Sequence, residues 1–102
     1  MGLSVRLEGE LGDTAAQVND PGNVLHRLLP SADDNASAVL RYIDWYGDTV
    51  FNRLQMKPFL DEWRALRDRA RSDDERKLVD EVRALAERCR DDPHLYLRFV
   101  GD

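Results

Sequence analysis

Two apolar stripes with the spacing of amphipathic helices, within residues 58–91, constrain the fold of this chain more than any other feature. The first stripe recurs at i, i+4, i+7 and i+11 and consists of Phe59, Trp63, Leu66 and Ala70. The second repeats this spacing, widened by two further apolar residues, and consists of Leu78, Val79, Val82, Leu85, Ala86 and Cys89. Because only about three residues join the two helices, they are predicted to pack antiparallel as a helical hairpin.

The ends of both helices carry local signals. Pro58 suits the first turn of a helix, where its missing N–H loses no intrahelical partner. Ser72 to Glu75 reads as a capping box at the start of the second helix, and Asp91 to Pro93 ends it. Charged residues at i, i+4 on the outer face predict three ion pairs: Arg76/Asp80, Lys77/Glu81 and Arg83/Glu87.

The two ends of the chain alternate apolar and polar residues, which is the period of a half-buried strand. Leu3 to Glu8 places Leu3, Val5 and Leu7 on one face. Thr14 to Val18 is a weaker extended stretch after the turn residues Gly9 to Asp13, so the two are predicted to form a hairpin. Leu95 to Val100 is predicted to be a terminal strand, with its inner face formed by Leu95, Leu97 and Phe99.

The middle of the chain is patterned less clearly. Asn19 to Asn23 is predicted to be a turn, followed by one helical turn at Val24 to Leu29 with Asn23 as its N-cap, before Pro30. Ser31 to Ser37 reads as a loop. Val39 to Ile43 is apolar and β-branched, which favours a third strand, and a helix beginning at Ala36 is the alternative.

Taken together, these elements predict one α+β domain spanning residues 1–102. Its expected architecture is a small antiparallel sheet of three or four strands, covered on one face by the antiparallel helix pair.

Charge and composition narrow the range of partners. The net charge is −5 and the pI about 5.0, which argues against nucleic-acid binding and favours a positively charged partner. The sequence contains no signal-peptide pattern and no apolar run long enough for a membrane helix, so we expect a cytoplasmic protein that does not bind membranes.

Residues with catalytic or metal-binding chemistry are sparse. One cysteine and two distant histidines do not form a zinc pattern, and no glycine-rich phosphate loop precedes a helix, so we predict no metal and no cofactor. Cys89 lies on the apolar stripe and is predicted to be a core residue. His26 is expected to be partly buried or on the surface, and His94 is a general-base candidate without an identified nucleophile.

Residues 44–55 break the local patterns and concentrate aromatic, acidic and amide side chains. We predict that partner binding uses Asp44, Trp45, Tyr46, Asp48 and Asn52, because aromatic residues are enriched at binding hot spots. The structural alternative is that Asp48 or Thr49 caps a helix or closes a turn, Gly47 supplies an unusual backbone angle, and Asn52 and Gln55 bond to the backbone.

Two motifs carry a resemblance that extends over the whole chain. The first is Tyr46-Gly47-Asp48-Thr49-Val50-Phe51-Asn52, and the second is the ending Tyr96-Leu97-Arg98-Phe99-Val100-Gly101-Asp102. With both, the chain resembles a group of small uncharacterised bacterial proteins. The resemblance implies a bacterial cytoplasmic protein and carries no activity or catalytic residues.

The leading hypothesis is a non-enzymatic protein-binding module, most specifically an immunity or antitoxin-like inhibitor that covers a basic toxin surface. One alternative is a small enzyme or ligand-binding domain with a pocket formed by Asp44, Asp48, Asn52 and His94. A second alternative is a homodimeric structural protein joined through an exposed strand edge.

Overall fold

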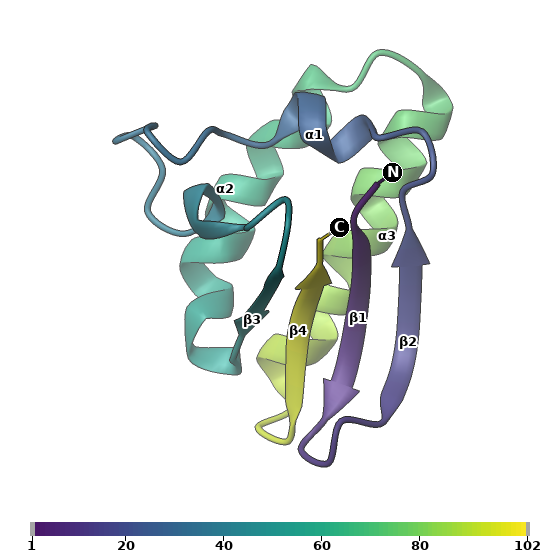
Figure 1. The fold of residues 1–102 in the computed structure, drawn as a ribbon, viewed down its shortest axis with the longest axis vertical. Coiled ribbons are helices and arrows are strands. Elements are labelled where there is room, and N and C mark those ends of the chain that lie inside the picture. The colour runs from purple at the N-terminus through teal and green to yellow at the C-terminus, as the bar shows by residue number, and fades with distance from the viewer. Residues whose placement is uncertain (1, 102) are drawn as a thin grey trace.

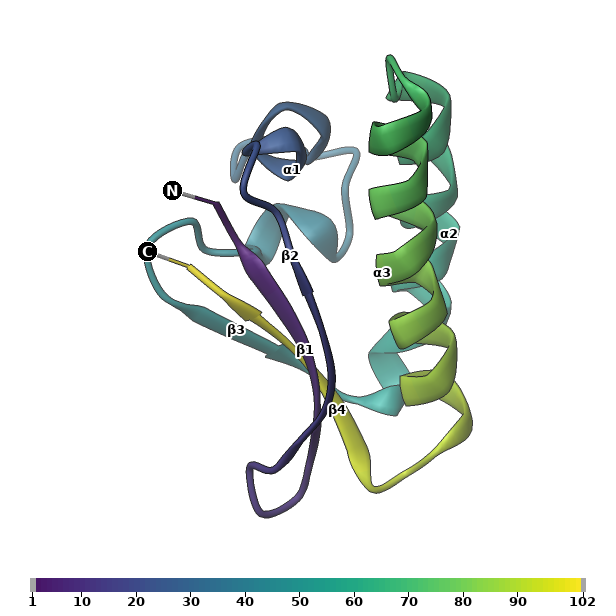
Figure 2. The same cartoon turned by 90° about the vertical axis from the view of Figure 1, so that its right-hand side faces the viewer.

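The computed structural model describes residues 2–101 as a four-stranded antiparallel sheet with the helix pair packed on one of its faces (Figures 1 and 2). The strand order is β2-β1-β4-β3, so β2 and β3 form the two edges. The predicted α+β class and the helix-covered sheet are therefore confirmed. The elements in chain order are β1 (Ser4–Gly9), β2 (Thr14–Asn19), α1 (Val24–Leu28), the 3-10 helix η1 (Leu40–Tyr42), β3 (Asp48–Phe51), the 3-10 helix η2 (Arg53–Gln55), α2 (Met56–Arg69), α3 (Asp73–Asp91) and β4 (Leu95–Val100).

The alternation of β1 and β4 sorts their side chains between the two faces of the sheet as predicted. Leu3, Val5 and Leu7 are buried against the helices, and so are Leu97 and Phe99 of β4. The two strands pair antiparallel, with Val5 opposite Phe99 and Leu7 opposite Leu97. The predicted hairpin between β1 and β2 is also confirmed, with an irregularity in register after Leu7.

The helix pair is confirmed, although α2 begins at Met56, two residues before Pro58. Ser72 caps α3, since its hydroxyl accepts a hydrogen bond from the Glu75 N–H at 3.2 Å. In a capping box the Glu75 side chain would accept a hydrogen bond from the N–H of Ser72. Here the Glu75 carboxylate instead accepts from the N–H of Arg71 at 2.8 Å and pairs with Arg27 of α1. The cap of α3 therefore also ties this helix to α1.

Two of the three predicted helix ion pairs are present, Lys77/Glu81 and Arg83/Glu87, each at 4.0 Å. The Arg76/Asp80 pair was predicted wrongly, because Arg76 instead pairs with Asp73 in the first turn. Asp80 accepts from Arg67 of α2 at 3.0 Å, so it links the two helices.

An aromatic cluster forms the centre of the core between the sheet and the helices. Phe59 and Trp63 of α2 stack at a centroid distance of 5.2 Å, and they are contacted by Phe51 of the edge strand β3 and Phe99 of the central strand β4. The buried Trp63 Nε1 donates to the Val79 carbonyl of α3 at 3.0 Å. Cys89 is fully buried, as predicted, and burial raises the pKa of its thiol to about 11.

The third strand lies in a different place from the predicted one. Val39 to Ile43 contains η1, while the strand beside β4 is Asp48–Phe51. Leu40 and Ile43 are both buried at a spacing of three residues, which is the period of a 3-10 helix. Neither the strand nor the alternative helix beginning at Ala36 was therefore the right prediction for this stretch.

The cap of α1 was also predicted wrongly. Asn23 has φ of 58° and makes no side-chain cap bond. Asp20 accepts instead, from the N–H groups of Val24 at 2.9 Å and Leu25 at 2.7 Å. Asn23 instead adopts the left-handed conformation, which asparagine tolerates well, in a turn where its N–H donates to the Asp20 carbonyl at 3.2 Å.

Candidate functional site

The two sequence motifs lie side by side as the paired strands β3 and β4. Asp48 lies opposite Val100 and Phe51 opposite Leu97. Beyond the strands, the Gly101 N–H donates to the Gly47 carbonyl at 2.7 Å. Asp102, the last residue of the second motif, lies outside the described residues.

Asp44 shapes the turn that leads into β3. Its carboxylate accepts from the Tyr46 N–H at 2.9 Å, and its own N–H donates to the Thr49 hydroxyl at 2.9 Å. Gly47 does not have the unusual backbone angle that we predicted, since Gly12 is the glycine with positive φ among residues 2–101. A Cβ atom at Gly47 would instead come within 2.9 Å of the Asp44 carboxylate, so a larger residue here would require the end of the Asp44 side chain to shift.

The two aromatic residues of the turn have different environments. Trp45 is half-buried and packs against the core, with its ring 4.4 Å from that of the exposed His26 in α1. Tyr46 is 82% exposed. Of the pair, Tyr46 is therefore the side chain that is available for a partner, and Trp45 holds the turn against α1.

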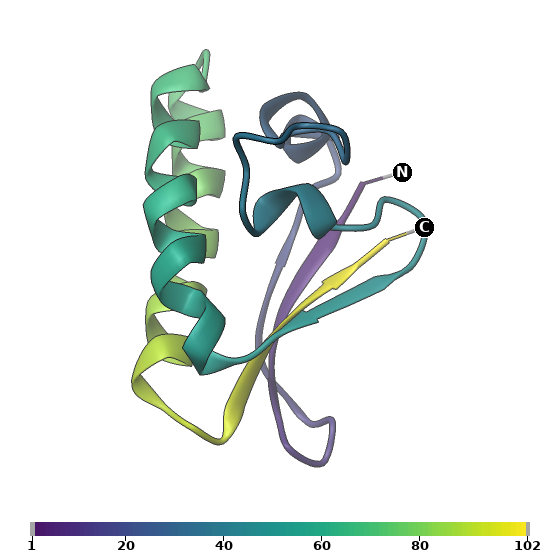
Figure 3. The same cartoon turned by 90° about the vertical axis from the view of Figure 1, so that its left-hand side faces the viewer.

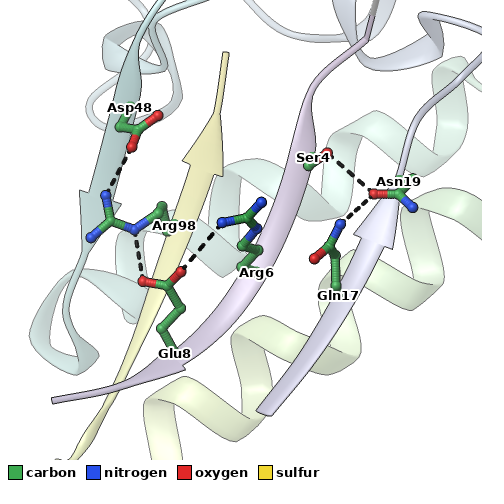
Figure 4. A network of polar contacts seen from close by, with 7 residues as sticks. All are labelled: Ser4, Arg6, Glu8, Gln17, Asn19, Asp48 and Arg98. Carbon is green, nitrogen blue, oxygen red and sulfur yellow. Dashed lines mark hydrogen bonds and ion pairs between the residues drawn. The ribbon is translucent and has the colours of Figure 1, made fainter. Parts of the chain in front are cut away.

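Asp48 belongs to a row of charges across the face of the sheet that the helices leave open (Figure 4). Arg98 donates to Asp48 at 3.0 Å and to Glu8 at 2.7 Å, and Arg6 lies 3.9 Å from Glu8. The Glu8 contact raises the pKa of Arg98 above its usual value, with a smaller contribution from Asp48. Asp48 is therefore both half-exposed and committed to an intramolecular contact.

Asn52 is the N-cap of η2, the 3-10 turn that leads directly into α2. Its side chain accepts from the N–H groups of Leu54 at 3.0 Å and Gln55 at 3.2 Å, and the Gln55 side chain accepts from the Asn52 N–H at 2.9 Å. The prediction that both side chains bond to the backbone is confirmed. The two form a reciprocal capping box.

The predicted carboxylate and histidine pocket is not brought together. Asp48 lies opposite Val100 at one end of β4, whereas His94 precedes Leu95 at the other end. At roughly 3.3 Å per residue, the length of β4 separates them by about 20 Å. His94 instead contacts Glu10 of the β1–β2 turn at 2.8 Å, and this hydrogen bond raises the pKa of His94.

Three exposed apolar residues close to Tyr46 in the sequence, namely Tyr42, Val50 and Leu54, were not singled out from the sequence. Five large apolar side chains are exposed in residues 2–101, and four of them lie between residues 42 and 54: Tyr42 at 63%, Tyr46 at 82%, Val50 at 44% and Leu54 at 70%. A signal for Val50 was available, since it neighbours Phe51 in an alternating stretch and the two must face opposite sides of the sheet.

Glu62 was also missed, although it determines the position of the long connection before η1. From α2 its carboxylate accepts from the N–H groups of Ala38 at 3.2 Å and Val39 at 2.7 Å, and from the Ser37 hydroxyl. One side chain therefore anchors residues 37–39 to α2. No local pattern in the sequence indicates a contact over such a separation.

Neither a cluster of metal-binding side chains nor a membrane-spanning helix is present in residues 2–101. These residues contain no group of three or more His, Cys, Asp or Glu placed to hold a metal ion. No helix in this part of the chain has the length and apolar character to cross a membrane.

Comparisons with protein-family models, with curated proteins and with solved structures find no match for this chain.

Proposed function

We propose that this chain is a non-enzymatic protein-binding module whose contact surface follows the β3 side of the molecule. The observation that carries the proposal is that four of the five exposed large apolar side chains in residues 2–101 belong to the segment that contains β3: Tyr42, Tyr46, Val50 and Leu54. Exposed apolar residues that gather on one part of a surface are typical of protein interfaces, and tyrosine is enriched among the residues that dominate binding energy.

The edge of β3 adds a second contribution to this surface. Because Gly101 bonds to Gly47, the alternation of the antiparallel ladder directs the N–H and C=O groups of Asp48 and Val50 away from β4. Figure 3 views the molecule from this side, with the teal strand β3 at the edge of the sheet. An extended partner segment could pair with these groups while its side chains contact Tyr46 and Val50.

The specific form that we propose is a cytoplasmic immunity or antitoxin-like inhibitor of a bacterial toxin. The net charge of −5 favours a basic partner, and Asp44 and Asp48 are the acids nearest to Tyr46 along the chain. Complementary charge increases the association rate and the specificity of such a complex. Trp45 and Asn52 support the surface from within the turn and the helix cap.

The test begins with affinity capture by the tagged chain from the bacterium that produces it, and with a co-expression assay against the product of the adjoining gene. Binding of a captured basic partner is then measured with the variants Tyr46→Ala and Val50→Lys. Each is expected to raise the Kd about tenfold or more, because each removes or charges an exposed apolar contact. The matched control is Leu11→Ala, since Leu11 is 97% exposed at the tip of the β1–β2 hairpin.

Two different negative results would contradict the proposed surface and the proposed function. A partner that binds both variants as tightly as the unmodified chain contradicts the proposed surface. A chain that captures no partner and gives no protection in co-expression contradicts the proposed function itself.

A further inference from the structure

The second edge of the sheet, β2, lacks the features with which soluble proteins usually protect an edge strand. Its six residues, Thr-Ala-Ala-Gln-Val-Asn, include no charged residue and no proline. Edge strands are commonly kept from pairing with other chains by charges, by proline or by very short length. The other edge, β3, is four residues long and carries the acid Asp48, which suits a basic partner better than a second copy of this acidic chain.

The backbone of β2 is available for pairing at two positions. The Asp20 N–H donates to the Leu3 carbonyl at 3.1 Å, and the ladder alternates from there with Val5 opposite Val18. The N–H and C=O groups of Gln17 and Asn19 therefore point away from β1, toward the open edge. In Figure 2, which faces this side of the molecule, β2 lies in front of the sheet with no strand beyond it.

The inner side of this edge is apolar and only partly covered. Ala16 and Val18 are half-buried against the core. Beside the end of β2 lies a hollow of about 450 Å³ toward α3. Val24 and Leu78 form its apolar part, and charged residues of α3 such as Asp74 and Glu81 also line it. An extended strand paired with β2 would cover the apolar surface of Ala16 and Val18 that is still exposed at the rim of the core.

From these observations we propose that the chain forms a homodimer by antiparallel pairing of β2 with β2 of a second copy, centred on Val18. In this register Gln17 pairs with Asn19 of the second copy on both sides of the two-fold axis. The two Val18 side chains meet at the axis on the helix side, in a pair without ladder hydrogen bonds, where side chains approach most closely. The result joins the two sheets into one continuous sheet.

A second copy is the occupant that fits this edge because the edge is complementary to itself. The uncharged strip meets an identical uncharged strip, and the amide side chains of Gln17 and Asn19, which bond to each other at 2.7 Å, can also donate and accept across the axis. An isologous contact uses the same patch twice, which is the usual arrangement of homodimers. A charged partner would find no opposite charge on β2.

The first experiment measures the mass of the intact chain in solution by sedimentation from roughly 1 µM to 1 mM, a range suited to a small interface. The unmodified chain is expected to shift from monomer to dimer. Gln17→Pro removes an outward N–H without removing a bond to β1, so it should weaken the dimer about tenfold or more while circular dichroism stays unchanged. The matched control is Val50→Pro at the outward position of the β3 edge, which should dimerise as the unmodified chain does.

The second experiment tests the register. Val18→Cys is expected to form a disulfide-linked dimer under mild oxidation, because the two Cβ atoms across the axis would lie within the range that a disulfide spans. Val50→Cys serves as the control and should form little disulfide-linked dimer, because Val50 lies on the opposite edge. A chain that is monomeric at every concentration, or Val18→Cys that crosslinks no better than Val50→Cys, overturns the proposal. Neither result affects the proposed function, whose surface lies at the opposite edge of the sheet.

Discussion

Gly101 lies where the end of β4 meets the turn that holds Trp45. A Cβ atom at this position would come within 2.6 Å of the Trp45 backbone and of the Gly47 carbonyl oxygen. Backbone atoms cannot move aside as the end of a flexible side chain can. The close contact explains why the second motif has glycine at this position.

Gly101→Ala is therefore expected to reduce the free energy of unfolding by about 1–3 kcal/mol, the usual cost of forcing atoms into a packed site. Denaturant unfolding followed by circular dichroism measures the change. Gly22→Ala is the matched control, since the nearest atom to a Cβ added there is Val24 Cγ2, at an ordinary van der Waals distance of 3.7 Å. Equal losses in both variants would contradict this account of Gly101.

The contact between His94 and Glu10 gives a prediction about pH. The hydrogen bond to Glu10 raises the pKa of His94 in the folded protein above its unfolded value of about 6.5. A raised histidine pKa means that the contact stabilises the fold fully below about pH 6.5, and that this stabilisation is lost as the pH rises through the folded pKa. Glu10→Gln should therefore lower the pKa of His94 in an NMR titration. Glu87→Gln is the control and should leave it unchanged; a folded pKa indifferent to Glu10→Gln would show that the contact is absent in solution.

At the scale of elements, the Asn52 cap connects β3 to the helix that supplies half of the aromatic core. Its side chain accepts hydrogen bonds from the N–H groups of Leu54 and Gln55, which have no preceding helical turn to supply a carbonyl partner. Together with Gln55 it determines where the strand ends and η2 and α2 begin. The residue predicted to bind a partner therefore has a structural role of its own.

Asn52→Ala is expected to reduce the free energy of unfolding by about 1 kcal/mol, while Asn52→Asp should retain most of it, because aspartate is also a good N-cap. Thermal or urea unfolding measures both. If Asn52→Ala is as stable as the unmodified chain, the cap contributes nothing measurable, and the case for Asn52 would rest on partner binding alone.

Over the whole molecule, the buried apolar residues form one cluster to which both the sheet and the helices contribute. Trp63 lies at its centre, fully buried, and Trp45 packs against its rim next to α1. The two tryptophans therefore report on the centre and on the rim of the same core.

Because a small domain with a single core usually unfolds in one step, urea unfolding should be two-state. Trp45→Phe leaves Trp63 as the fluorescent reporter, and its transition is expected to coincide with that of circular dichroism for the same variant. A fluorescence midpoint that differs from the dichroism midpoint would indicate that the helix pair and the sheet unfold separately. Phe51→Leu, which trims the aromatic cluster, should lower both midpoints together.

The parts of the fold that were predicted correctly are those with a signal in a short stretch of sequence. The stripe from Phe59 to Leu66, the Ser72 cap and the alternation of β1 and β4 all follow from a helical or strand period and from hydrogen bonds within a few residues. The roles of Asn52 and Gln55 belong to the same class, because a capping box spans only four positions.

Tertiary structure decided the rest. Whether Val39 to Ile43 or Asp48 to Phe51 pairs with β4 depends on competition between segments for one place beside a distant strand, and local propensity does not determine the outcome. The same holds for Glu62, whose partners lie more than twenty residues away, and for the exposure of Tyr46 and Val50. The sequence by itself determined the two long helices, the strands β1, β2 and β4, and the inner faces of these elements. Their order in the sheet, and with it the two open edges, depends on contacts between residues that are far apart in the chain.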